Sequence, residues 1–196
     1  MHANVQLKNQ IYKLFTNNAQ YSALFVHNGI LSHYEGDECM NYQIRKMKPS
    51  EYPLLEDFLY QAVFQRDETN LAPKSIIEEP ALQMYIQDFG TMKDDYCLCA
   101  EINQKIVGAV WVRNIKGYGS IDEETPEFAI SLYKEYRGQG IGTELMRRML
   151  VLLKSEGYVK TSLAVQKDNY ALHMYQHIGF QIVDENQEEY IMEYRF

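Results

Sequence analysis

Apolar side chains recur at two different spacings along this chain. Segments in which every second residue is apolar indicate half-buried strands, and segments with apolar residues at i, i+3 and i+4 indicate amphipathic helices. Residues 42–47 alternate in this way, and residues 96–102, 105–113, 127–133, 161–165, 180–183 and 190–194 are further strand-like runs, so we expect all of these segments to be strands. The segments with helical spacing are residues 52–63 after an expected N-cap at Ser50, 75–89 with an interruption near Pro80, 141–156 and 169–178.

The connections between these segments predict how the strands pair. Asn103-Gln104 is a two-residue link between two strands, so we expect an antiparallel hairpin there. Strand 127–133, helix 141–156 and strand 161–165 follow one another, and a helical crossover indicates parallel strands. The expected fold is therefore a mixed α/β (α+β) domain, in which helices flank a central sheet with both kinds of pairing.

Residues 1–41 lack this regularity, and we interpret them as a partly helical N-terminal extension before one domain at residues 42–196. Within the extension, residues 5–15 have nearly helical spacing. The pair Asn28-Gly29 lies between apolar residues, which is typical both of a tight hairpin and of a helix end. We favour the helix, and we expect residues 35–38 to form a solvated linker.

The composition is that of a globular chain with a sizeable core. The 196 residues are 46% hydrophobic and carry a formal net charge of −8. This acidity argues against non-specific nucleic-acid binding, which needs a basic surface, and weakly favours a cationic substrate. No apolar run approaches the ~20 residues that cross a bilayer, and the N-terminus lacks a signal-peptide pattern. We therefore expect a cytoplasmic protein with no membrane partner.

The cysteine and histidine residues predict neither a disulfide scaffold nor a metal site. Cys97 and Cys99 lie two apart in an expected strand, so both side chains point to the same face, where we expect them to be buried and reduced. His173 and His177 are four apart on an expected helix, a spacing that can hold zinc, but no third ligand is apparent.

The most specific chemistry lies in the turn Arg137-Gly138-Gln139-Gly140-Ile141-Gly142, between an expected strand and an expected helix. Alternating glycines allow the backbone to approach a ligand without interference from Cβ atoms. The helix that follows points its free N–H groups and the positive end of its dipole into the turn. With the planar cation of Arg137, this arrangement predicts a phosphate-binding site.

Two other phosphate-binding patterns fit this turn less well. A P-loop requires Gly-x-x-x-x-Gly-Lys-Ser/Thr, and no Lys-Ser/Thr pair follows Gly138. A dinucleotide-binding turn has glycine or alanine where this chain has Thr143, and no acidic residue obviously ends the next strand to hold a ribose. A nucleotide ligand such as NAD or ATP is therefore the weaker interpretation.

The segment Tyr136-Arg-Gly-Gln-Gly-Ile-Gly142 resembles the acetyl-coenzyme A loop of the GNAT N-acetyltransferases, whose pattern is Gln/Arg-x-x-Gly-x-Gly/Ala. A second segment resembles another signature of that superfamily through Asn169, Ala171, Tyr175 and Gly179-Phe180. The resemblance covers about residues 42–196. It implies a V-shaped mixed sheet, acetyl-coenzyme A as cosubstrate, and direct transfer of the acetyl group from the thioester to an amine.

The resemblance also implies roles for individual residues. The expected coenzyme-binding residues are Ile130, Leu132, Arg137, Gly138, Gln139, Gly140, Ile141, Gly142, Thr143, Asn169 and Tyr175. Tyr175 is the expected general acid, and the amide of Leu132 is the expected donor to the carbonyl oxygen. Glu127 is the candidate general base, acting by contact or through water, and a solvated residue beside Pro126 is the alternative of equal weight.

The acceptor amine is not readable from the sequence. Small polyamines, amino acids, aminoglycosides and protein N-termini stay open, because acceptor specificity comes from the variable loops around residues 65–79 and 117–125. The acidic balance favours a small cationic amine. The rival from another class is a non-catalytic sensor or interaction module that binds acyl-coenzyme A, and the resemblance also allows a homodimer.

Overall fold

A computed structural model describes the backbone of residues 24–27, 30–35, 38–63 and 71–196, and the side chains from residue 41 onward within these ranges. Its strands are β1 Leu24–His27, β2 Ile30–Glu35, β3 Glu38–Lys46, β4 Tyr96–Ile102, β5 Lys105–Arg113, β6 Glu127–Leu132, β7 Lys160–Gln166, β8 Gln181–Glu185 and β9 Glu189–Arg195. Its α-helices are α1 Leu55–Ala62, α2 Pro80–Gln83, α3 Ile141–Ser155 and α4 Ala171–Ile178, and its short 3-10 helices are η1 Pro49–Leu54, η2 Lys74–Glu78 and η3 Lys134–Tyr136.

The described strands form one open sheet in the order β1-β2-β3-β4-β5-β6-β7-β9-β8. Neighbouring strands are antiparallel except for β6 and β7, which are parallel, as the α3 crossover predicts. The expected mixed fold is therefore confirmed. The two-residue link Asn103-Gln104 is also confirmed as a hairpin turn, with φ of +49° and +66° at its two residues.

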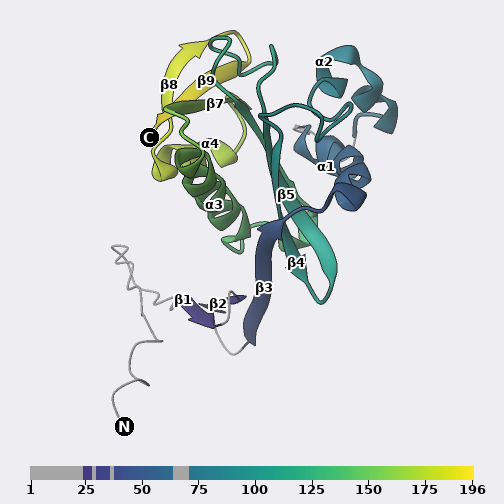
Figure 1. The fold of residues 1–196 in the computed structure, drawn as a ribbon, viewed down its shortest axis with the longest axis vertical. Coiled ribbons are helices and arrows are strands. Elements are labelled where there is room, and N and C mark those ends of the chain that lie inside the picture. Colours follow the sequence, from purple (N-terminus) through teal and green to yellow (C-terminus); the bar gives the residue numbers. More distant parts are fainter. Residues whose placement is uncertain (1–23, 28–29, 36–37, 64–70) are drawn as a thin grey trace.

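Helices cover both faces of the sheet, with α3 and α4 on one face and α1 and α2 on the other (Figure 1). The central strands β4 and β5 are buried on both faces, and successive residues feed different cores. Leu98 and Ala100 join the core beneath α3 and α4. Cys97 and Cys99 join the core beneath α1 and α2, as expected for two small apolar side chains on one face of a strand.

The parallel strands β6 and β7 separate almost at once. They pair at a single position, where Glu127 lies beside Ser162, and the amide of Ser162 donates to the carbonyl of Pro126 at 3.1 Å. Beyond that point the strands diverge toward their carboxyl ends. This splay is the V-shaped sheet that the resemblance implies, and it leaves one edge of β6 without a strand partner over most of its length.

Two expected helix starts differ from the structure. Lys48, rather than Ser50, is the N-cap of the first helical segment, and the amide of Lys48 donates to the Glu51 carboxylate at 2.8 Å. That segment begins as the 3-10 helix η1, which contains Pro53, and α1 starts only at Leu55. A proline lacks an amide hydrogen, so the α-helical bond pattern becomes continuous only after it. The expected helical region 75–89 contains η2 and α2, followed by turns up to Gly90.

The prediction of a helix around Asn28-Gly29 is wrong. The residues on either side of it belong to strands, because β1 and β2 pair antiparallel with His27 opposite Ile30, and this pairing fits the hairpin that was the alternative. Asn28-Gly29 themselves lie outside the described residues. Glu35 at the end of β2 pairs with Glu38 at the start of β3, so these two residues belong to strands rather than to a linker, and residues 36–37 between them lie outside the described residues. β3 therefore runs through the expected boundary at residue 42 without a break, and the expected helix at residues 5–15 lies outside the described residues.

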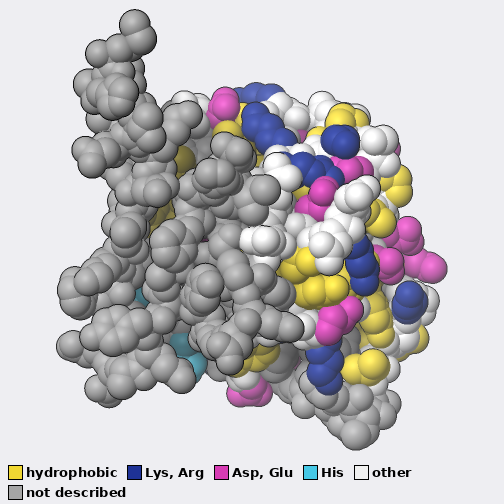
Figure 2. Space-filling model, turned by 90° about the horizontal axis from the view of Figure 1, so that it is seen from below, with side chains coloured by type: hydrophobic (Ala, Val, Ile, Leu, Met, Phe, Trp, Pro, Cys, Tyr) yellow, Lys and Arg dark blue, Asp and Glu magenta, His cyan; other side chains and the backbone are white. Residues whose placement is uncertain are grey.

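The surface of the described part carries charges of both signs. On the face seen from below in Figure 2, lysine and arginine side chains are interspersed with aspartate and glutamate over the described region, and no continuous basic patch forms there. None of the helices in the described ranges has the length and apolar character that a bilayer crossing requires.

Candidate functional site

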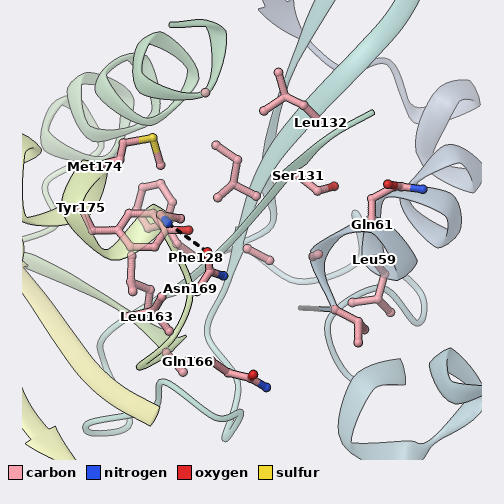
Figure 3. Close-up of a pocket in the computed structure, with 18 of the residues that line it drawn as sticks. Leu59, Gln61, Phe128, Ser131, Leu132, Leu163, Gln166, Asn169, Met174 and Tyr175 are labelled. Carbon is pink, nitrogen blue, oxygen red and sulfur yellow. Dashed lines mark hydrogen bonds between the residues drawn. The ribbon is translucent and has the colours of Figure 1, made fainter. Parts of the chain in front are cut away.

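The splay between β6 and β7 opens into a cleft of about 1260 Å³. Its walls come from β6, β7, the glycine turn before α3, the start of α4, the end of α1, and the turn between β8 and β9. Figure 3 shows Met174 and Tyr175 facing β6 from the α4 side, and Leu59 and Gln61 facing it from the α1 side. The cleft therefore reaches both faces of the sheet, because among the described residues β6 and β7 pair at only one position.

The glycine turn has the backbone conformation that its sequence predicts. Gly138 and Gly140 have φ of +75° and +79°, a left-handed region that residues with a Cβ rarely occupy. The first intrahelical bond of α3 runs from the amide of Glu144 to the carbonyl of Gly140 at 3.1 Å. The amides of residues 141–143 thus precede the helical bond ladder, and Gly140, Gly142 and Thr143 line the cleft. Such a helix start binds anions.

The side chains of this turn contact other parts of the protein rather than facing a phosphate as expected. The Arg137 guanidinium donates from Nε to the carbonyl of Leu132 at 2.9 Å and from Nη2 to the side-chain oxygen of Gln61 at 3.1 Å. It thus ties the turn to the ends of β6 and α1 instead of standing free for a phosphate. Gln139 turns back to donate to the carbonyl of Glu135 at 2.9 Å, and Ile141 is buried in the core. The capacity to hold an anion therefore lies in the main chain.

The edge of β6 that faces the gap presents backbone groups. The amide of Tyr133 donates to Val107 of β5 at 3.0 Å, and backbone groups alternate in direction along an antiparallel strand. Odd-numbered residues of β6 therefore bond to β5, and Ile130 and Leu132 turn their amides toward the splay. Both residues line the cleft, as expected for residues that receive an extended ligand along the strand.

On the opposite wall, Asn169 lies just before α4 and Tyr175 lies within it. The Asn169 side-chain oxygen accepts a hydrogen bond from the amide of Ala171 at 2.9 Å, which closes a turn at the helix start although Tyr170 is the N-cap, and Asn169 also lines the cleft. Tyr175 is 8% exposed and packs edge-on to Phe180, with its ring pointing toward β6 (Figure 3). Burial raises the pKa of its hydroxyl, which keeps the phenol protonated.

Glu127 is buried, so the alternative of a solvated residue is wrong. Its side chain is 2% exposed and lies at the narrow end of the splay. One carboxylate oxygen, Oε1, accepts hydrogen bonds from the Tyr85 hydroxyl and from the amide of Gly119, the latter at 2.7 Å. Desolvation raises the pKa of Glu127 to about 7, although both hydrogen bonds oppose this rise. A carboxyl group with this pKa can exchange a proton near neutral pH.

Sequence reasoning missed Tyr85, which lies 42 residues from Glu127 in the chain. The sequence predicts that Gly117 and Gly119 lie in a variable loop that sets acceptor specificity, and the two-residue spacing of these glycines was a usable signal of close packing. A Cβ at Gly117 would lie 2.6 Å from Glu127 Oε2, and a Cβ at Gly119 would lie 2.5 Å from the backbone of Ala164. Trp111 is fully buried and donates to the carbonyl of Tyr85 at 3.1 Å, so its role is to pack in the core.

Basic and acidic side chains line different ends of the cleft. The lysine and arginine that line it, Lys134 and Arg137, lie at the glycine-turn end. The acidic residues that line it are Glu127, Glu188 and Glu189, from the narrow end and the β8–β9 turn. Among the described residues, no group of three or more histidine, cysteine, aspartate or glutamate side chains is arranged to hold a metal ion.

The comparisons with known proteins agree with this geometry. A family model described as "Acetyltransferase (GNAT) family" matches residues 59–180. N-alpha-acetyltransferase 30 of Schizosaccharomyces pombe is 26% identical over 129 residues, which cover 62% of this chain and 80% of that protein. N-acetyltransferase family 8 member 2 of Rattus norvegicus is 32% identical over 83 residues, which cover 42% of this chain and 37% of that protein.

Solved structures share the fold at lower identity. The PaiA N-acetyltransferase of Thermoplasma acidophilum in complex with coenzyme A has a TM-score of 0.61 and 18% identity, over 80% of this chain and 100% of that chain. A GNAT family acetyltransferase of Elizabethkingia anophelis with acetyl-CoA bound has a TM-score of 0.56 and 19% identity, over 79% of this chain and 98% of that chain.

Proposed function

The chain belongs to the acetyltransferase (GNAT) family, and from that premise we propose that it moves an acetyl group directly from acetyl-coenzyme A to an amine acceptor. One observation carries the proposal. β6 and β7 pair only at Glu127 and Ser162 and then diverge, which opens a single cleft between a glycine turn and a buried carboxyl group. A ligand anchored at the turn and extended along β6 has its far end near that carboxyl group.

The proposed coenzyme site uses main-chain donors. The amides of residues 138–143 receive the diphosphate at the start of α3, and the amides of Ile130 and Leu132 receive the pantetheine arm along the open edge of β6. The geometry fits these roles, because Gly138, Gly140, Gly142 and Thr143 line the same cleft as Ile130 and Leu132. Arg137 contributes by fixing the turn against Leu132 and Gln61.

Acetyl-coenzyme A, when bound, supplies a thioester carbonyl that is already activated, so no covalent enzyme intermediate is required. Glu127 accepts a proton from the acceptor ammonium, by contact or through one water, and so exposes the nitrogen lone pair. The amide of Leu132 donates to the carbonyl oxygen as negative charge develops there. Tyr175 donates its hydroxyl proton to the departing thiolate as the C–S bond breaks and the C–N bond forms.

The charge distribution of the cleft supports a small cationic amine as the acceptor. The end opposite the glycine turn is lined by Glu127, Glu188 and Glu189, and no lysine or arginine among the described residues lines that end. A second positive group on the acceptor would gain from the carboxylates of the β8–β9 turn while the reacting amine meets Glu127. A protein N-terminus is the second candidate, because the S. pombe relative is named an N-alpha-acetyltransferase.

Release of free coenzyme A tests the function and the acceptor class together. The panel contains an alkyl diamine, an alkyl monoamine of equal length, and a neutral peptide with a free N-terminus. We expect the diamine to have the highest kcat/KM, and we expect Glu189→Gln to reduce its advantage over the monoamine. Faster turnover of the peptide would favour a protein acceptor, and tight coenzyme binding without turnover of any amine would favour the non-catalytic sensor.

A further inference from the structure

The hydrogen bonds around Glu127 treat its two oxygens differently. Oε1 accepts from the Tyr85 hydroxyl and from the amide of Gly119 at 2.7 Å. Oε2 is buried and has no hydrogen-bond partner within the part of the chain that the structure describes. A buried carboxylate oxygen without a partner is costly, so its persistence points to a role in which a ligand supplies the missing donor.

Tyr85 is held in place from both of its ends. Its carbonyl accepts from Trp111 Nε1 at 3.1 Å, and its hydroxyl accepts from the amide of Tyr118 at 2.8 Å. Arg113 donates to the flanking carbonyls of Met84 at 3.0 Å and Gln87 at 2.7 Å. The turn that carries Tyr85 is therefore fixed to β5, the strand next to Glu127. This anchoring gives the hydroxyl one position relative to the carboxylate.

The loop before β6 is pressed against the same pair. A Cβ at Gly117 would lie 2.4 Å from the Tyr85 hydroxyl oxygen, closer than a real Cβ contact allows. At Gly119, a Cβ would lie 2.5 Å from the backbone nitrogen of Ala164 in β7. Both positions therefore require glycine for close approach, and this approach delivers the Gly119 amide to Oε1.

We propose that Tyr85 is a positioning residue for Glu127: with the Gly119 amide it occupies Oε1, and it leaves Oε2 as the atom that accepts the proton of the acceptor amine. This inference rests on the proposed function, in which Glu127 is the base. Tyr85 acts through Glu127 and does not itself exchange a proton with substrate. Glu127→Gln removes the base, whereas Tyr85→Phe leaves the base in place with weaker control of its proton affinity.

The other charged groups that face Glu127 do not replace the Tyr85 hydroxyl in lowering the pKa of Glu127. Arg113, opposite Glu127 on β5, is paired with Asp95 at 2.8 Å. Desolvation raises the pKa of Glu127 most, and Glu189 of β9 raises it further. The Tyr85 hydroxyl and the Gly119 amide lower it. Loss of the hydroxyl therefore raises the pKa of Glu127, and the enzyme needs a higher pH to hold its base in the active form.

The test is the pH dependence of kcat/KM for wild type, Tyr85→Phe and Tyr158→Phe. Wild type is expected to lose activity as pH falls through about 7, the pKa of Glu127. In Tyr85→Phe this acid limb should move upward by about 1 to 2 pH units, because a hydrogen bond to a charged group is lost. Activity should return to within about threefold of wild type above the new limb. Tyr158→Phe is the matched control, because Tyr158 donates to the Asp94 carboxylate outside the cleft, and its limb should not move.

The outcomes separate this inference from the proposed function. Retained turnover in Glu127→Gln, with no acid limb near neutrality in wild type, would remove Glu127 as the base. Lost turnover in Glu127→Gln with an unmoved limb in Tyr85→Phe would overturn only the positioning role. A uniform loss at every pH in Tyr85→Phe would do the same, since a packing defect has no pH signature.

A second variant covers a folding failure of Tyr85→Phe, which would show as lost acetyl-coenzyme A binding by calorimetry. Site-specific replacement of Tyr85 by 3-fluorotyrosine keeps the ring and hydroxyl and makes the phenol a stronger donor. The acid limb should then move to lower pH. An unmoved limb, or movement to higher pH, would contradict the inference.

Discussion

Replacement of Glu127 by glutamine should stabilise the folded protein at alkaline pH while it abolishes turnover. Burial raises the pKa of Glu127 from 4.5 to about 7, so ionisation of this carboxyl group costs folding free energy. Glutamine keeps the shape and an oxygen that accepts from Tyr85 and Gly119, but it carries no charge. The proposed base is therefore expected to lower the free energy of unfolding when it is ionised.

The size and the sign of this change in the free energy of unfolding both follow from the pKa shift of Glu127. A rise from 4.5 to about 7 corresponds to about 3 kcal/mol when the group is fully ionised. The folded pKa is the higher one, so the folded state binds the proton more tightly. The resulting stability is fully present below about pH 4.5 and is lost as pH rises through about 7. Between about pH 5 and pH 8.5, wild type should lose about 2 to 3 kcal/mol relative to Glu127→Gln.

Urea unfolding of wild type and Glu127→Gln at both pH values measures this difference, and effects common to both proteins cancel. Glu51→Gln is the control of opposite sign. The bond to Arg45 holds the pKa of Glu51 down to about 2, so its stabilisation is present above 4.5 and lost only as pH falls through about 2. The difference in the free energy of unfolding between wild type and Glu51→Gln should therefore stay constant from about pH 5 to pH 8.5. A flat difference for Glu127→Gln over the same range would refute the raised pKa.

Three further substitutions test the other parts of the site. Tyr175→Phe should lower kcat by about 10²-fold, the lower end for a general acid, with acetyl-coenzyme A affinity by calorimetry unchanged; equal loss of both would assign Tyr175 to packing. Gly140→Val should weaken coenzyme binding at least about tenfold, because it adds a side chain where φ is +79° and the ligand approaches. The matched control is Gly157→Ala, which changes a glycine with φ of +89° at the far end of α3 and should leave the coenzyme affinity unchanged. Arg137→Gln should lower the free energy of unfolding by about 1 to 3 kcal/mol through its lost bonds to Leu132 and Gln61, and urea unfolding indistinguishable from wild type would exclude this tether.

The elements that sequence predicted best are those with local chemistry. The turn at residues 137–142 needs glycine at Gly138 and Gly140 because both have positive φ, and the α3 helix must start where those residues end. Local patterns also describe β4 and β5, which are apolar on both faces. Each of these signals lies within a dozen residues, so no knowledge of tertiary structure is required to read it.

The N-terminal hairpin shows where local chemistry is ambiguous. Asn28-Gly29 suits a left-handed residue after a helix as well as a two-residue turn. The choice is made by β3, against which β2 pairs from Leu31 to Glu35. Which strand lies beside β2 depends on the tertiary structure, so the short apolar runs on either side of Asn28-Gly29 could not show that they form strands.

Glu127 shows the same limit at the site. Its position at the start of β6 was readable, but its protonation behaviour depends on Tyr85, 42 residues away, and on a loop that approaches closely only because it carries glycine. The proline beside it suggested a solvated loop, whereas burial against the α1 side of the sheet raises its pKa. A carboxylate of the same type, Glu51, has its pKa lowered by a neighbouring arginine. Residue type alone thus fixes neither the size nor the sign of the shift.

The two-residue repeat of β6 determines from which side each reactant reaches the site. Odd-numbered side chains face α1 and α2: Ala129 packs in that core and Ser131 donates to the carbonyl of Phe58 in α1 at 2.6 Å. Glu127 shares their parity, whereas Tyr175 approaches from α4 on the opposite face. The proposed base and the proposed acid therefore lie on opposite sides of one strand, along whose free edge we expect the thioester to lie. Because a shift of one residue in a strand exchanges its faces, this register leads us to expect that the amine enters beside α1 and that the thiol leaves beside α4.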